Sequence, residues 1–149
     1  MRTSPPGPSG WPDIHAAFEH MFDYARRVPA FVPPGWPGEV LPPDAPDWET
    51  SAVKWLLDLC PPEYRRYQGL RRHPVVLARF AVVHGEADQA AVRRGLSSVR
   101  VDLRDFCTPP VIEAAAQTFL LEDARLTGVR RAVGLVEDAL KGRRYKPRL

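Results

Sequence analysis

The sequence predicts an all-α protein, a helical bundle of four to five helices with a Pro-rich extended strap and a long C-terminal antiparallel helical hairpin. Three observations support this fold class. Apolar residues recur at steps of three and four, as on one face of a helix. Prolines and glycines fall between these stretches, where they end one helix or open the next. No stretch of useful length alternates as a strand does, and there is no repeat of 20 to 50 residues.

The 149 residues fit one domain of ordinary size. Residues 1–11 are mainly Pro, Gly and Ser, so we expect a disordered N-terminus. A single helical domain is then expected over residues 12–141, followed by a basic tail over 142–149.

A first helix is predicted from Asp13, as its cap, to about Arg27. Its apolar positions step by 4, 3, 4 and 3: Ile14, Phe18, Met21, Ala25 and Val28. Residues 29–47 hold seven prolines and two glycines and cannot continue this helix. We expect an extended strap on the domain surface, anchored by Trp36, and a flexible linker is the alternative.

Asp47 is the predicted N-cap of a second helix that runs to Cys60. It has only a thin polar edge, so it should be the most buried helix. Pro61 and Pro62 end it and open a short helical piece, residues 62–68, which Gly69 closes.

Residues 74–106 are apolar-periodic, but the apolar face of the first part lies about 110° around the helix from that of the second. Either the helix kinks or breaks near Gly85, or it is straight and serves different neighbours at its two ends. Gly85 and Gly95 favour the kink, since each costs about 1 kcal/mol in a helix interior.

Thr108 and Pro109 begin the last helix, which runs to about Leu140. Its apolar stripe recurs every seven residues and pairs with the preceding helical segment as an antiparallel hairpin. The stripe consists of Ile112, Phe119, Leu126, Val133 and Leu140, joined by Ala115, Val129 and Val136.

Glu122 interrupts this stripe. If the hairpin turns near residue 108, Glu122 is level with Gly95 and within reach of Arg93 or Arg94. A buried carboxylate needs a partner, so we predict a structural ion pair from Glu122 to Arg93 or Arg94. The alternative is a carboxylate at the rim of the hairpin, in water.

The net charge of +3 is modest but unevenly distributed. Residues 1–60 carry 4 basic and 8 acidic groups, residues 61–104 carry 9 and 4, and residues 105–149 carry 8 and 6. All but three of the 21 basic residues are arginines, a bias that also follows from the codon usage of a GC-rich bacterial genome. The cationic middle attracts nucleic acid or faces the acidic N-terminal segment.

Several protein classes are not indicated. The first residues lack the apolar core of a secretory signal, and no run is apolar and long enough to span a membrane. Cys60 and Cys107 stand alone, which is typical of reduced cysteines in a cytoplasmic protein.

No catalytic residue, metal site or cofactor is predicted. The most metal-like set, His15, Glu19, His20 and Asp23, lies on the polar side of the first helix, where solvated charge is expected. His84 has no acid or thiol at a recognisable spacing, so we expect a hydrogen-bonded core or boundary histidine. Nucleotide-binding and hydrolase motifs are absent.

Two arginine sets remain. Arg79, Arg93 and Arg100 share heptad spacing, but Glu86 interrupts them, which favours an ordinary charged face. A nucleic-acid-binding protein would use a second set on phosphates, with Tyr64 or Tyr67 stacking on bases. That set comprises Arg65, Arg66, Arg71, Arg72, Arg143, Arg144 and Lys146.

We therefore expect a non-enzymatic, cytoplasmic helical protein that acts through protein–protein contacts and self-associates by the heptad face of its hairpin. A nucleic-acid-associated protein is the alternative, and an enzyme whose site is not visible in the sequence is the second.

Overall fold

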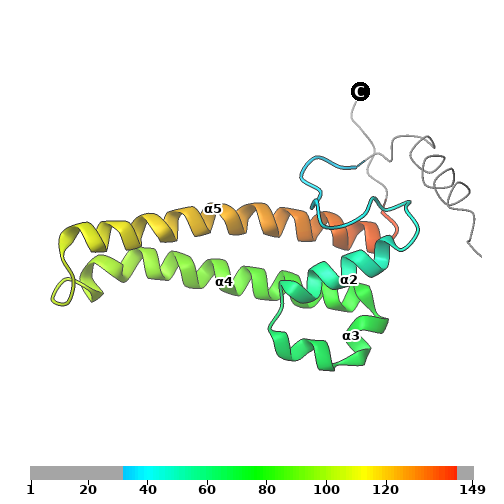
Figure 1. The fold of residues 1–149 in the computed structure, drawn as a ribbon, viewed down its shortest axis with the longest axis horizontal. Coiled ribbons are helices and arrows are strands. Elements are labelled where there is room, and N and C mark those ends of the chain that lie inside the picture. Colours follow the sequence, from blue (N-terminus) through cyan, green and yellow to red (C-terminus); the bar gives the residue numbers. More distant parts are fainter. Residues whose placement is uncertain (1–31, 144–149) are drawn as a thin grey trace, which may run out of the picture. The chain divides into compact units, whose positions relative to one another are not determined.

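The computed structural model describes residues 32–143, and every regular element within that range is helical (Figure 1). In chain order these elements are α2 (Trp48–Asp58), the 3-10 helix η1 (Pro62–Arg66), α3 (Gln68–Arg72), α4 (Pro74–Asp102) and α5 (Pro109–Leu140). The all-α prediction with a long C-terminal hairpin is confirmed. The predicted first helix and most of the basic tail lie outside the described residues. In the part that is described, no helix is long and apolar enough to cross a membrane.

Helices α4 and α5 lie side by side and antiparallel along their whole length (Figure 1). Helix α4 passes through Gly85 without a break. The two ends of α4 have different neighbours, as the second alternative expected, because the first half of α4 packs against both α2 and α5. It ends at Asp102, four residues before the predicted Phe106.

The hydrophobic core occupies one end of this hairpin, where α2 packs against both long helices. Four of the 11 residues of α2 are buried, against seven of 32 in α5 and five of 29 in α4, so α2 is the most buried of the described helices, as predicted. Leu56, Leu77 and Val136 are fully enclosed there. Burying each such side chain contributes about 1.5–3 kcal/mol.

The strap residues 32–47 form turns that pack on this core. The Trp36 indole Nε1 donates to the Val40 carbonyl at 2.9 Å, and Val40 is buried. Ser51 of α2 ties the strap to the helix, since its hydroxyl accepts from the Leu41 amide at 3.0 Å. The predicted capping role of Asp47 is wrong. Its backbone is left-handed, with φ of 61°, and its side chain makes no capping hydrogen bond.

The segment after α2 also differs from the prediction. Tyr67, with ψ of 98°, separates η1 from α3, and Gly69 lies inside α3 rather than closing a helix. Arg71 and Arg72 therefore belong to the last turn of α3.

Candidate functional site

Tyr64 and His84 form the most catalysis-like contact, at the boundary of the core. His84 Nε2 lies 2.9 Å from the Tyr64 hydroxyl, and the Tyr64 ring packs edge-on against His84 and Phe80. The expectation of a hydrogen-bonded boundary histidine is confirmed. Tyr67 packs edge-on against Tyr64, yet it is 53% exposed.

The described residues contain no group of three or more His, Cys, Asp or Glu side chains that could hold a metal ion. The set around His15 and Glu19 lies outside them. Cys60 is buried, and burial raises the pKa of its thiol, which disfavours the thiolate that a nucleophile requires.

A buried polar layer joins α4 to α5 at Gln89, which is 2% exposed. Its amide nitrogen donates to Asp123 Oδ1 at 2.9 Å and to Thr127 Oγ1 at 2.8 Å. Its amide oxygen accepts from Arg130 Nη1 at 2.8 Å. These bonds satisfy both ends of the amide only in one alignment of the helices, so the layer fixes the register of the hairpin.

The predicted ion pair from Glu122 to Arg93 or Arg94 is wrong. Glu122 pairs with Arg125 three residues along its own helix, at 2.5 Å, and Arg93 pairs with Asp123 at 2.8 Å. Arg93 meets α5 close to the predicted position along the hairpin. Successive residues of a helix point about 100° apart, however, so Asp123 faces α4 and Glu122 does not. The Arg125 hydrogen bond lowers the pKa of Glu122.

The arginines at heptad spacing on α4 form part of a series of ion pairs across the hairpin. Arg79 pairs with Glu137, Arg93 with Asp123, and Arg100 with Glu113. At Glu86, which interrupts the heptad series, the acidic partner is on α4 and the basic partner, Arg130, is on α5. These arginines neutralise the protein's own carboxylates, so they are not a ridge left open for phosphate.

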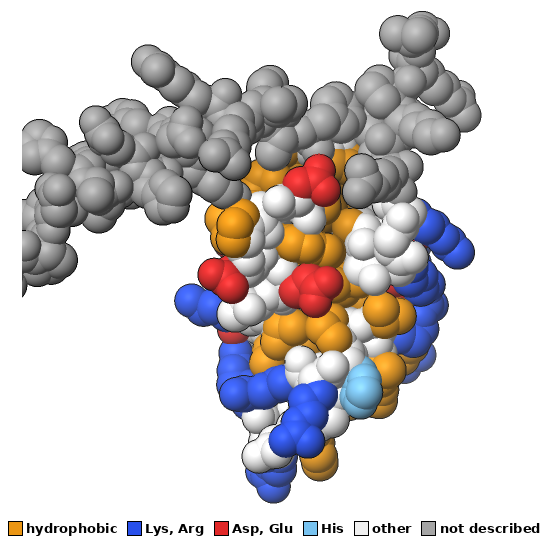
Figure 2. Space-filling view, turned by 90° about the vertical axis from the view of Figure 1, so that its right-hand side faces the viewer, with side chains coloured by type: hydrophobic (Ala, Val, Ile, Leu, Met, Phe, Trp, Pro, Cys, Tyr) orange, Lys and Arg blue, Asp and Glu red, His pale blue; other side chains and the backbone are white. Residues whose placement is uncertain are grey.

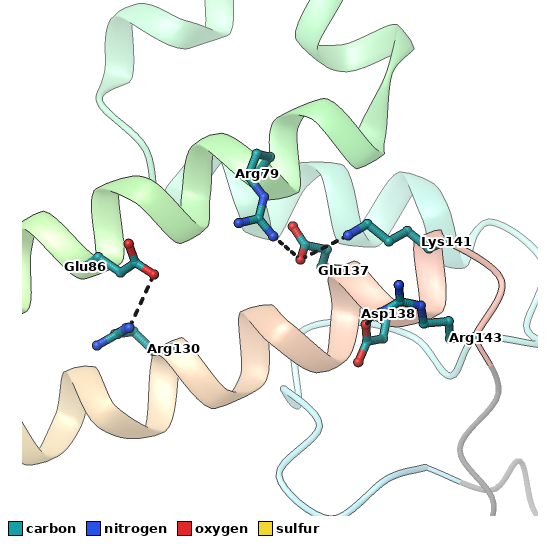
Figure 3. Close-up of polar contacts among 7 residues, drawn as sticks. All are labelled: Arg79, Glu86, Arg130, Glu137, Asp138, Lys141 and Arg143. Atoms are coloured by element: carbon teal, nitrogen blue, oxygen red, sulfur yellow. Dashed lines mark hydrogen bonds and ion pairs between the residues drawn. The ribbon is translucent and has the colours of Figure 1, made fainter.

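Glu137 is the most enclosed member of this series (Figure 3). Its side chain is 9% exposed and lies between Arg79 and Lys141, whose Nζ is 3.3 Å from Oε1. Its other oxygen, Oε2, is buried and has no hydrogen-bond partner among residues 32–143. Sequence reasoning missed this residue, because an isolated Glu in an apolar stripe does not reveal how deeply it lies.

A basic cleft of about 610 Å³ lies between α2 and the η1–α3 corner. Three of the predicted nucleic-acid-binding residues, Arg65, Arg71 and Arg72, line it together with Lys54. Arg65 pairs with Asp58 at 2.5 Å, whereas Lys54, Arg71 and Arg72 have no ion pair with any carboxylate of the described residues. In Figure 2, Lys and Arg side chains gather in the lower part of this end of the molecule, beside exposed apolar ones.

The other predicted residues do not join this cleft. Arg66 is exposed but does not line it, and Arg143 pairs with Asp138 at 3.0 Å near the end of α5 (Figure 3). Arg144 and Lys146 lie outside the described residues. Lys54 was not among the predicted residues, and only the packing of α2 brings it to the cleft.

The heptad face of α5, predicted as the self-association surface, is occupied within the chain. Ile112, Leu126 and Val133 are buried, and the Phe119 ring lies against Gly95 of α4. Other apolar side chains are exposed instead. On α4, the loop and α5 they include Val83, Val101, Phe106, Val111, Leu120 and Leu121.

No protein-family model, curated protein or solved structure matches this chain.

Proposed function

We propose that this protein is a non-enzymatic helical protein that acts through protein–protein contacts made by the far part of its hairpin. That part, the hairpin arm, comprises residues 83–128, none of which belongs to the core cluster of the described structure. A cytoplasmic setting is part of the proposal and is supported by the free cysteines Cys60 and Cys107.

The main support is the amount of apolar surface left open on the arm. Two helices bury only the seam between them, and here the seam encloses four apolar side chains: Val99, Ile112, Ala116 and Leu126. Six large apolar residues of the arm are exposed, with Phe106 at 84%, Val101 at 67% and Leu121 at 64%. Exposed apolar surface on a thin element is typical of an interaction site.

Photo-crosslinking in cells tests this proposal. A photoreactive amino acid is placed at Val83 or Val101 on the arm, with Glu63 on η1 as an exposed control. We expect protein adducts from both arm positions and none from the control. Adducts at all three positions, or at none, would contradict a contact role for the arm.

The basic cleft supports a second candidate, binding of nucleic acid. Lys54, Arg71 and Arg72 line the cleft together with the apolar residues Val53 and Leu57. Arginine and lysine side chains bind phosphates, with an affinity that falls steeply as the salt concentration rises.

A gel shift on duplex and single-stranded DNA and RNA at low salt tests the second candidate. Arg71→Gln/Arg72→Gln removes two charges from the cleft, and Arg66→Gln/Arg143→Gln removes two outside it. If the cleft binds phosphates, only the first variant loses affinity. Equal loss in both variants indicates non-specific charge, and no binding by the native protein rejects the candidate.

A further inference from the structure

We propose that the protein forms a two-fold symmetric dimer in which the outward face of α4 pairs antiparallel with the same face of a second copy. This inference rests on the proposed contact function and names the partner. The face, here called the outer stripe, is opposite α5. It comprises Val76, Phe80, Val83, Ala87, Ala90, Arg94, Ser97 and Val101.

The outer stripe has the pattern of a helix that lacks a partner. Its members follow one another at steps of 4, 3, 4, 3, 4, 3 and 4, the spacing of the a and d positions of a coiled coil. All eight are exposed, and six are apolar. Helix α4 thus carries one seam for α5 and a second seam that the described residues leave open, except that the Tyr64 ring packs edge-on against Phe80.

The order of side chains along the stripe fits a two-fold axis. The steps read the same in both directions, with the centre between Ala87 and Ala90, and a two-fold interface requires such self-complementarity. Antiparallel pairing sets Ala87 against Ala90 of the second copy, where small residues let the backbones approach. It sets Phe80 against Ser97, a bulky side chain against a small one, and Val76 against Val101.

Arg94 distinguishes the antiparallel arrangement from the parallel one. In parallel pairing, Arg94 meets Arg94 of the second copy, and the like charges repel. In antiparallel pairing it lies opposite Val83, where its aliphatic stem packs and its guanidinium reaches water.

The charged flank of the stripe favours the same arrangement. Four charged residues beside the stripe occupy the g position of the heptad: Arg79, Glu86, Arg93 and Arg100. In an antiparallel coiled coil, the g positions of the two helices lie beside each other. Glu86, which Arg130 contacts within the chain, then lies beside Arg93 of the second copy, which Asp123 contacts within its own chain, and this contact occurs twice. Arg79 lies beside Arg100, but Glu137 and Glu113 already neutralise both.

Sedimentation of the full chain from about 1 to 200 μM tests the dimer, a range that covers micromolar dissociation constants. We expect the mass to rise with concentration from 16.7 kDa toward twice that value. Ala90→Glu should raise the dissociation constant by roughly 100-fold or more, because it buries two unpaired charges at the axis. Ala124→Glu, the same substitution at an exposed alanine of α5, should leave it unchanged.

Charge reversal tests the orientation. Glu86→Arg should weaken the dimer, and Glu86→Arg/Arg93→Glu should restore it, with circular dichroism showing that each variant is folded. A dimer that Ala124→Glu disrupts and Ala90→Glu does not would overturn the proposal.

The outcomes separate this inference from the proposed function. A chain that stays monomeric while its arm crosslinks to another protein overturns the dimer and leaves the contact function intact. A monomer without adducts overturns both. A monomer that dimerises only after Phe18→Glu would show that the chain's own N-terminal segment covers the stripe, which also overturns the dimer.

Discussion

At the scale of single residues, the ion pairs across the hairpin differ in how much water surrounds them. The Glu137 side chain is 9% exposed, whereas the Glu113 side chain is 63% exposed. A carboxylate in water loses little when its partner is removed, because water replaces the lost hydrogen bonds. A buried carboxylate has no such replacement, so its partner matters more.

Arg79→Gln should therefore destabilise the protein by about 1–3 kcal/mol, with Lys141 limiting the loss because it still contacts Glu137. Arg100→Gln, which removes the partner of Glu113, should cause a much smaller change. Urea denaturation of both variants at one protein concentration measures the difference. Equal losses would show that the burial of Glu137 does not determine the strength of its pair.

At the scale of elements, the close approach of α4 and α5 depends on Gly95. A Cβ atom there would lie 2.6 Å from the Phe119 ring, a distance at which the helices must shift. Gly128 of α5 is also helical, but a Cβ there would meet nothing within 4 Å. The two glycines have equal helix propensity and different surroundings, so substituting each by alanine separates the effect of helix propensity from that of packing.

Gly128→Ala should stabilise the protein by about 0.5–1 kcal/mol through helix propensity alone. Gly95→Ala gains the same propensity but overpacks the contact with Phe119. Overpacking costs about 1–3 kcal/mol, so we expect net destabilisation. Thermal melting of the two variants gives the comparison. A stabilising Gly95→Ala would mean that Phe119 can move aside without cost.

At the scale of the whole molecule, stability should depend on the carboxylates that arginines hold. Hydrogen bonds from Arg100 and Arg125 lower the pKa of Glu113 and of Glu122, and those from Gln89 and then Arg93 lower the pKa of Asp123. A carboxyl group with a lowered folded-state pKa stabilises the protein above its unfolded pKa. This stabilisation is lost as the pH falls through the folded value.

The melting temperature should accordingly be steady near neutral pH and fall below about pH 4.5, the ordinary pKa of a glutamate. Glu113→Gln/Glu122→Gln should melt at a lower temperature at pH 7 and lose less on acidification. The two curves should converge at the lowest pH. Parallel curves would assign the acid sensitivity to other groups.

Much of the fold could be predicted from the sequence. The boundaries of α5 and the level at which Arg93 meets α5 follow from proline positions and apolar spacing, which act along the chain. The basic cleft was only partly predictable. Arg71 and Arg72 were recognised, but their meeting with Arg65 and Lys54 depends on the turn at Tyr67 and on where α2 lies.

The sequence by itself determined that the chain forms helices, where most of them begin, and that the last two pair antiparallel, because helix periodicity and proline breaks are local properties. Only the tertiary structure decided that Asp123 rather than Glu122 faces α4, that Glu137 is buried, and that the heptad face of α5 is already filled. It also showed the outer stripe of α4 to be exposed. These features depend on helix rotation and on the packing of distant segments, and a one-dimensional pattern of apolar residues does not specify which of two seams the chain itself will fill.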